Sequence, residues 1–516
     1  MPAFRRDFLQ RAGALALASQ LPGCTAPGPR LRHDPFALGV ASGDPAPDGV
    51  VLWTRLLPAQ PDAPLAPHEV RWEIAHDPGF RRIVRSGQTQ ALPAWGHSVH
   101  VELQGLEPGR GYFYRFHCAG ASSATGRTRT APAPDTLEPR LRLVWASCQR
   151  WEHGEYASWR HVAASAPDLV LFLGDYIYEY ASPQDTHGLA RVHNLPLART
   201  LQDYRARYAL YKSDPHLQAA HAACPWAVTW DDHEVENDWA GLYGRAHDAQ
   251  AFAAQRLAAF QAYYEHMPLR AASLARGVGQ LQVYRSLAWG RLARIALLDA
   301  RQYRDWQACR TPGSSGGAGV RPAQCAGWAD PARSLLGRAQ EAWLDTALAR
   351  SRRDGVRWSV LAQQTLFSPR FSPSGLRSSD SWDGYPAARL RLLQSLARQP
   401  QRNTVLLGGD IHQNYVCQVH ANPDQPDSAV LASEFCGTSI SSRAGTTQAR
   451  VDALMRHNPQ VLLANCEQRG WGAAEVTADR WTTDLHAVDE PLHAGSGAHL
   501  LARFVVEDGR AGPQRA

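Results

Sequence analysis

The spacing of apolar residues changes along the chain and separates it into two parts. Between residues 36 and 130, apolar and polar residues alternate in short runs that Asp-Pro and Pro-Gly turns separate. Alternation with a period of two predicts strands that bury one face. The predicted strands are residues 50–55, 70–75, 97–103 and 112–116. We therefore predict a small all-β sandwich domain of immunoglobulin or fibronectin type over residues 36–130.

Beyond residue 140, continuous apolar runs alternate with segments of helical spacing. The runs, which predict strands buried on both faces, are residues 141–146, 169–173, 226–230, 292–298, 358–361, 405–407 and 504–506. Residues 249–266 and 338–350 have the spacing of helices. This alternation predicts an α/β layered domain over residues 140–510. We interpret residues 191–223 and 368–386 as insertions near the rim of the sheet, where lids lie.

Polar side chains follow four of these runs directly. The four groups are Ser147-Cys148-Gln149, then Asp175 with Tyr178, then Asp231-Asp232-His233-Glu234 with Asn237, and finally Gly409-Asp410-Ile411-His412. In a mainly parallel sheet these ends lie at one edge, which is where α/β sheets bind ligands. So many buried carboxylates would repel one another unless cations were present. The pattern therefore predicts a site for several metal ions.

Each group taken alone also has a purely structural interpretation. Asp175 could cap the following helix with Tyr178 packed beneath it, Cys148 could be a core thiol, and His412 could be a hydrogen-bonded histidine. The agreement of four strand ends favours the metal site.

Composition restricts the class of protein but does not by itself indicate a function. The chain has 516 residues, 44% hydrophobic and 20% charged, which indicates a globular protein of two domains. The net charge of +6 is carried by arginine, with Lys212 the only lysine. Arginine favours anionic substrates, although codon bias explains the excess equally well. No basic cluster is interleaved with aromatic residues, so we predict no specific binding of nucleic acid.

The amino-terminal residues 1–30 resemble an export segment. Arg5-Arg6 followed by Phe8-Leu9 precedes a moderately apolar run over residues 12–21, as in signals for the Tat export machinery. This run is too short for an ordinary transmembrane helix. The sequence around Cys24 resembles a lipid-attachment motif, but its proline is unusual there, so lipidation stays open. We expect a periplasmic or extracellular protein.

Nine cysteines are present, and two of them flank a loop rich in glycine and serine. Cys309 and Cys325 enclose this loop, residues 311–323. In an oxidising compartment such a pair predicts a disulfide.

The order of the motifs resembles the calcineurin-like metallophosphoesterases, and within them the PhoD-like alkaline phosphatase and phosphodiesterase family. The resemblance includes the four strand-end groups and residues 39–45, 52–55, 298–304 and 434–442. It also includes two departures from the wider superfamily: Ser-Cys-Gln replaces an Asp-x-His motif, and Gly-Asp-x-His replaces Gly-His-x-His. The resemblance implies a metallophosphoesterase-like catalytic domain.

The resemblance also implies the cofactor: Fe3+ with Ca2+ rather than a pair of zinc ions. Thiolate and phenolate suit iron, so Cys148 and Tyr178 would bind it, and Asp175 would bridge iron and calcium. Asp410 and His412 would complete the cluster. For the third strand end, Asp232 and Asn237 both remain candidate ligands, and Asn237 matches the family pattern better.

From this we predict an exported metal-dependent phosphoesterase. It would hydrolyse phosphate monoesters, and diesters as further substrates, by attack of a metal-activated hydroxide. Asp175 and His233 are the catalytic candidates, with His233 a general acid or an orienting group. Arg301 and Arg304 are either phosphate clamps or ion pairs that hold a loop. The alternatives are a phosphodiesterase acting mainly on phospholipid or wall-polymer diesters, and an inactive surface binding protein.

Overall fold

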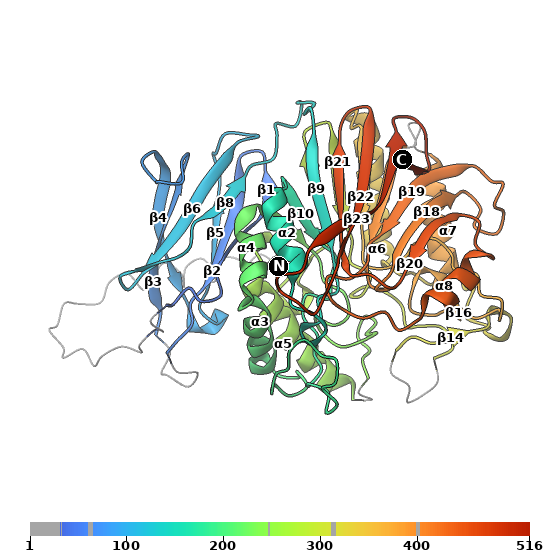
Figure 1. Ribbon diagram of the computed structural model, residues 1–516, viewed down its shortest axis with the longest axis horizontal. Coiled ribbons are helices and arrows are strands. Elements are labelled where there is room, and N and C mark those ends of the chain that lie inside the picture. The colour runs from blue at the N-terminus through green and yellow to red at the C-terminus, as the bar shows by residue number, and fades with distance from the viewer. Residues whose placement is uncertain (1–30, 32–33, 60–65, 246–247, 311–315, 399–402) are drawn as a thin grey trace, which may run out of the picture.

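Two β-sheets face each other in the centre of the protein, with helices on their outer sides (Figure 1). The computed structural model describes residues 31, 34–59, 66–245, 248–310, 316–398 and 403–516. The predicted export segment, with Cys24, lies outside the described residues.

The first sheet has ten strands and the second has seven. In spatial order the first contains β24 (Gln514–Arg515), β23 (Ala498–Glu507), β22 (Arg480–Val488), β21 (Gly470–Val476), β9 (Leu141–Ala146), β10 (Leu169–Phe172), β11 (Pro225–Val228), β1 (Val40–Ala46), β2 (Gly49–Arg55) and β5 (Ser98–Leu103). The second contains β12 (Arg285–Trp289), β13 (Ala293–Leu297), β15 (Trp358–Ala362), β17 (Thr404–Gly408), β19 (Val430–Cys436), β18 (Asn414–His420) and β20 (Val461–Asn465).

The core between the sheets comes from alternate residues of buried strands. On β9, Leu143 and Trp145 pack between the sheets, whereas Val144 packs against helices on the outer side. On β17, Leu407 faces the first sheet and Leu406 faces outward. Since both faces of these strands are covered, the strands appear in the sequence as continuous apolar runs.

Helices cover the outer face of each sheet. Those packed on the ten-stranded sheet are α2 (Ala157–Ser165), α3 (Leu201–Lys212), α4 (Pro215–Ala223) and α5 (Ala249–His266). Those packed on the seven-stranded sheet are α6 (Arg338–Arg353) and α7 (Pro386–Ala397), and α8 (Gln448–Met455) contacts β20. Interpreting residues 191–223 as a rim insertion is therefore wrong for the part that forms α3 and α4, because Tyr204 and Leu217 belong to the core under the first sheet.

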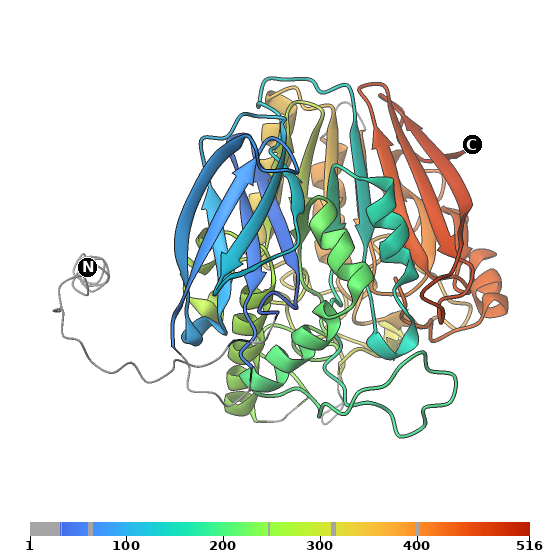
Figure 2. The same ribbon diagram turned by 60° about the vertical axis from the view of Figure 1, so that its left-hand side comes forward.

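The amino-terminal strands form an all-β part whose second sheet is shared with the rest of the protein. Strands β4 (Ile83–Ala91), β3 (His68–Ala75), β6 (Gly111–Cys118), β7 (Ala121–Ser122) and β8 (Gly126–Arg129) make a separate sheet. This sheet packs on β1, β2 and β5 through one apolar cluster. Figure 2 shows these blue strands at one side of the green helices and the red carboxyl-terminal strands at the other. The assignment to an immunoglobulin or fibronectin type remains a prediction.

A single sheet runs across the expected boundary between the two parts of the chain. Strand β1 pairs in parallel with β11, with Ser42 opposite Pro225 and Gly43 opposite Trp226. The boundaries at residues 36–130 and 140–510 remain predictions.

The four strand ends predicted to carry the metal site do not belong to one sheet. Strands β9, β10 and β11 are adjacent and parallel in the ten-stranded sheet. Strand β17 lies in the seven-stranded sheet, where it pairs in parallel with β15 and β19. The one-sheet interpretation is therefore wrong, since the site forms where the edges of two stacked sheets meet.

The predicted disulfide between Cys309 and Cys325 is confirmed. The other six cysteines that the structure describes, including Cys148, are buried and free. Among the described helices, none combines the length and the apolar character needed to span a bilayer.

Close packing of β1 on β11 yields a stability prediction. A Cβ added at Gly43 would lie 2.6 Å from the carbonyl oxygen of Pro268 and 2.7 Å from that of Trp226. We expect Gly43→Ala to lower the free energy of unfolding by about 1–3 kcal/mol, because backbone atoms cannot yield. Gly327→Ala is the control, since no atom lies within 4 Å of its added Cβ. Equal unfolding midpoints of the two variants in guanidinium would contradict the close packing around Gly43.

Candidate functional site

Four candidate site residues hold the backbone in the left-handed region at the strand ends. They are Cys148 (φ 59°), Asp175 (φ 58°), Asp410 (φ 64°) and His412 (φ 54°). Non-glycine residues adopt this conformation at a cost, and structures retain it mainly where the surroundings enforce it, often at functional sites.

The turns after the strands are held by close contacts that leave no room for larger residues. A Cβ at Gly174 would lie 2.4 Å from Cβ of Asp231, and one at Gly409 would lie 2.2 Å from Oγ of Ser147. The Cys148 amide donates to the carbonyl of Gly174 over 3.1 Å. These contacts bring the ends of β9, β10, β11 and β17 against one another.

The side chains at these ends form three overlapping groups of potential metal ligands. In each group, one donor atom per residue lies within 4.8 Å of the others. The groups are Cys148, Asp175 and His412, then Asp175, Asp232 and His233, and finally Asp231, Asp232 and Asp410. Because Asp175 and Asp232 are each shared by two groups, the arrangement can hold more than one ion with bridging carboxylates.

The first group contains the softer donors, and Tyr178 completes it. The Tyr178 hydroxyl donates to Oδ2 of Asp175 over 2.8 Å and lies 3.0 Å from Nε2 of His412. The Nδ1 atom of His412 lies 2.9 Å from the carbonyl oxygen of Arg443. With the proton on Nδ1 bound to this carbonyl, Nε2 is left with a lone pair on the side of the cluster.

The second end of the cluster is composed of carboxylates. Burial raises the pKa of Asp232 to about 7, while Arg301 and His233 act in the opposite direction. Burial also raises the pKa of Asp231 and of Asp410, again against the effect of Arg301. Oδ2 of Asp231 is buried and has no hydrogen-bond partner among the described residues. Cations at this position would favour the ionised carboxylates and satisfy that oxygen.

Arg301 and Arg304 are buried in ion pairs. Arg301 contacts Asp231 through Nε, Asp380 through Nη1 at 2.8 Å and Asp410 through Nη2 at 3.4 Å. Arg304 pairs with the same Asp380 and donates to its backbone carbonyl over 3.1 Å. Of the two interpretations of these arginines, ion pairing describes their contacts.

His233 is paired with Glu179 rather than with its neighbour in sequence. Its Nδ1 atom lies 2.7 Å from Oε2 of Glu179, which is fully buried. Burial opposes protonation of His233, but Glu179, Asp175 and Asp232 raise its pKa well above the usual value. Glu234 instead accepts the backbone N–H groups of Asp175, Tyr176 and Asp231 at 2.7–3.0 Å, and so ties two strand ends together.

The structure therefore brings together Cys148, Asp175, Tyr178, Asp232, His233, Asp410 and His412. Asn237 lies at the margin: its Oδ1 accepts from the Tyr180 hydroxyl over 2.9 Å, and its N–H donates to Glu179 over 3.0 Å. Asp231 was not among the predicted metal ligands, and the pairing of His233 with Glu179 was not predicted. Asp231 precedes Asp232 in the third group and Glu179 directly follows Tyr178, so this adjacency in sequence was the available signal.

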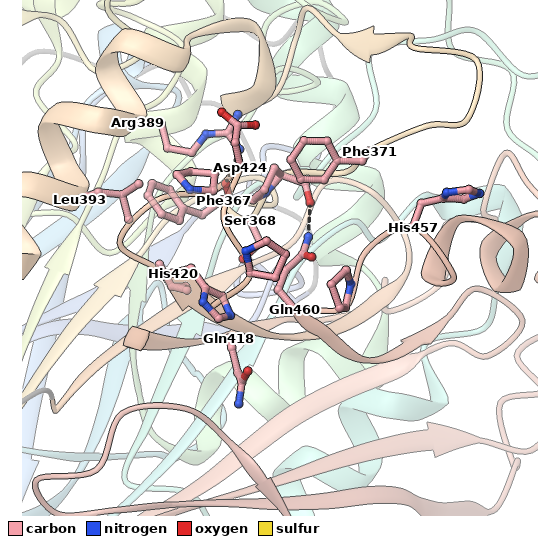
Figure 3. A pocket seen from close by; sticks show the side chains of 15 residues that line it. Phe367, Ser368, Phe371, Arg389, Leu393, Gln418, His420, Asp424, His457 and Gln460 are labelled. Carbon is pink, nitrogen blue, oxygen red and sulfur yellow. Dashed lines mark hydrogen bonds between the residues drawn. The ribbon is translucent and has the colours of Figure 1, made fainter. Parts of the chain in front are cut away.

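Two cavities lie near the segment 367–372, and only one adjoins the cluster. The cavity in Figure 3 has a volume of about 230 Å³, and none of the candidate ligands lines it. The second has a volume of about 600 Å³ and is lined by Asp410, Asp238, Asp380, Arg370 and Arg377 among others. The Asp238 amide donates to Oδ2 of the ligand candidate Asp232 over 2.7 Å. A substrate bound at the cluster would therefore have room on this side.

Comparisons with known proteins agree with this geometry. The family model of PhoD-like phosphatases matches residues 143–485, and that of the PhoD-like phosphatase N-terminal domain matches residues 23–132. Alkaline phosphatase D of Bacillus subtilis is 41% identical over 527 residues, covering 98% of this chain and 88% of that protein.

Solved structures extend the likeness to three dimensions. A structure of PhoD, 41% identical, superposes with a TM-score of 0.87 over 95% of this chain and 93% of its own. Purple acid phosphatase PPD1 from yellow lupin (Lupinus luteus) seeds is 11% identical and matches in fold alone, with a TM-score of 0.55 over 91% of this chain and 73% of its own. The fold is thus metallophosphoesterase-like, and the chain belongs to the PhoD-like phosphatase family.

Proposed function

We propose that this protein is an exported, metal-dependent phosphoesterase that hydrolyses phosphate monoesters and diesters. The observation that carries the proposal is the set of three overlapping donor groups at the ends of β9, β10, β11 and β17. A phosphate ester has little need of a protein nucleophile if bound cations neutralise its oxygens. The name of the relative with 41% identity, alkaline phosphatase D, supports the same reaction class.

The donor set supports Fe3+ with Ca2+ as the cofactors. A thiol, a phenol and an imidazole surround Asp175 at one end of the cluster, and these donors suit Fe3+. Asp231, Asp232 and Asp410 offer only oxygen atoms at the other end, and these suit Ca2+. Asp175 belongs to both the first and second groups, which fits a bridge between unlike ions. Asn237, engaged with Tyr180, would have to exchange that partner to bind a metal.

When bound, the metal ions supply Lewis acidity and lower the pKa of water. The chain itself orients the reacting groups. Arg301 holds Asp231 and Asp410, from different sheets, at fixed positions, and Glu234 holds the backbone of Asp175 and Asp231. In this proposal His233, which Glu179 orients, would donate a proton to the leaving oxygen.

Two alternatives remain to be compared with this proposal. A phosphodiesterase acting mainly on phospholipid or wall-polymer diesters would use the same cluster. The cavity of about 600 Å³ next to Asp410 has room for the second ester substituent of such a substrate. An inactive surface binding protein would be expected to have lost ligands, yet every predicted donor is present in the sequence.

Export through the Tat machinery rests on Arg5-Arg6 and the apolar run that follows. The disulfide between Cys309 and Cys325 supports a final location in an oxidising compartment, periplasmic or extracellular. A lipid anchor at Cys24 is a further option that mass spectrometry of the mature protein would decide.

We expect purified protein to contain iron and calcium and to hydrolyse 4-nitrophenyl phosphate and bis(4-nitrophenyl) phosphate. Cys148→Ala should lose most of its iron, its visible absorption and at least about 100-fold in kcat/KM, because a ligand is removed. Asp232→Asn should lose calcium and keep iron. Elemental analysis, absorption spectra and both assays check this.

Cys224→Ala is the control for Cys148→Ala, since it removes another buried thiol outside the cluster. The cofactor assignment would be refuted if elemental analysis found neither iron nor calcium in the purified protein. Full iron content in Cys148→Ala would refute the ligand role of this thiol.

A general acid at His233 predicts sensitivity to the leaving group. His233→Ala should slow hydrolysis of glycerol phosphate by about 100- to 10,000-fold, because an alkoxide leaves poorly without a proton. The loss with 4-nitrophenyl phosphate should be much smaller, since nitrophenolate needs no proton. Glu179→Gln should show the same pattern more weakly. His420→Ala, away from the cluster, is the control. Equal losses on both substrates would show that His233 acts only through the metal site.

A further inference from the structure

We propose that the cavity beside Asp410 binds a second phosphate group of the substrate through Arg370 and Arg377. This inference rests on the proposed function, because it concerns the part of a phosphate ester that extends beyond the reacting phosphate. The cavity has a volume of about 600 Å³ and includes both arginines and the ligand candidate Asp410 in its lining.

The wall that carries the arginines is built by two loops that pair with each other. Strand β14 (Gly319–Val320) pairs antiparallel with β16 (Arg377–Ser378), with Val320 opposite Arg377. Strand β14 lies within the loop that the disulfide between Cys309 and Cys325 closes. The same loop donates the Gly317 amide to Oδ2 of Asp238 over 2.9 Å. Arg377 thus pairs with a loop that is closed by a disulfide and hydrogen-bonded to Asp238 at the rim of the cluster.

Successive residues of the segment 369–372 line the two cavities in turn. Pro369 and Phe371 line the cavity shown in Figure 3, whereas Arg370 and Ser372 line the cavity beside Asp410. The Arg377 guanidinium stacks on Phe371, with its central carbon 3.8 Å from the ring centroid. Phe371 therefore separates the two cavities and supports one of the arginines.

In the described part of the chain neither arginine forms an ion pair, although Asp383 acts electrostatically on Arg377 and the Arg370 side chain interacts with that of Tyr415. Among the described residues, no carboxylate oxygen lies within 4.0 Å of the guanidinium of Arg370 or Arg377. Both arginines line the cavity. Phosphate oxygens match the planar fork of arginine, so a phosphate group in this cavity suits the two guanidinium groups.

The acidic residues that share the cavity already have partners. Asp380 is bound by Arg301, Arg304 and Gln307. Asp410 accepts from the Thr365 hydroxyl over 2.9 Å and belongs to the metal-ligand groups. Asp238 accepts the Gly317 amide. The positive charge available to a ligand is therefore that of Arg370 and Arg377.

The chemical class that fits is a compound with two phosphate groups joined by a spacer. One phosphate lies at the metal donors and reacts, and the other lies between Arg370 and Arg377. The reaction is unchanged: water adds to the reacting phosphorus, its ester oxygen leaves with a proton, and the distal phosphate is not altered.

The test uses hydrolysis-resistant ligands on the full-length, metal-loaded protein. Binding of α,ω-alkane bisphosphonates with two to six methylenes is compared by calorimetry with alkylphosphonates of the same length. At one spacer length the bisphosphonate should bind at least about tenfold more tightly, as for a charge-assisted contact. In Arg370→Gln and in Arg377→Gln this ratio should fall below about threefold, while alkylphosphonate affinity stays unchanged.

Arg450→Gln is the matched control: it removes an exposed charge from α8 next to the lining residue Val451, and Arg450 itself does not line the cavity. It should keep the full ratio. The ω-carboxyalkylphosphonates of the same length should gain less than the bisphosphonates; an equal gain would overturn the assignment of phosphate as the distal group.

The proposal would be overturned if, on the unaltered protein, no bisphosphonate bound more tightly than the alkylphosphonate of the same length. This outcome does not depend on whether the variants fold. A ratio that survives both arginine substitutions would do so as well. Since binding is measured without turnover, failure to hydrolyse 4-nitrophenyl phosphate would count against the proposed function alone.

Discussion

One guanidinium group ties the edges of the two sheets together at the cluster. Arg301 follows β13 in the seven-stranded sheet and reaches Asp231, which follows β11 in the ten-stranded sheet, while a second nitrogen contacts Asp410 after β17. Burial opposes the charge of Arg301, but these carboxylates raise its pKa well above its usual value. One arginine cannot neutralise every carboxylate of the cluster. The remaining negative charge is what suits the site to cations.

The same edge stores backbone strain. Left-handed conformations occur at Cys148, Asp175, Asp410 and His412, where the chain turns within a few residues after buried strands end. Packing between the sheets is extensive enough to hold these turns, with Trp145, Leu171 and Leu407 in one apolar core. The positions of the donor side chains therefore depend on the layered fold, because the core fixes the strands and the strand ends carry the donors.

The two ends of the cluster differ in their donor atoms, and only the Asp410 end adjoins the larger cavity. Softer donors lie at the Tyr178 end and carboxylates at the Asp410 end. The larger cavity opens beside Asp410, and its wall comes from the disulfide-closed loop and from segment 370–378. These loops lie outside the two central sheets, so they can differ between relatives while the donors stay in place.

Hydrophobic periodicity was sufficient to predict β9 to the residue, α5 to the residue and most of the buried strands, because strands covered on both faces appear as apolar runs. The motifs after those runs were sufficient to predict Cys148, Asp175, Tyr178, Asp410 and His412 as neighbours. Strand pairing could not be predicted in this way: periodicity does not say which strands share a sheet, so β17 was assigned to the wrong one. The same limit concealed the pairing of β1 with β11, the contact of His233 with Glu179, and the ion pairs of Arg301. Each of these contacts joins residues far apart in the chain, so the residues come together only in the folded tertiary structure.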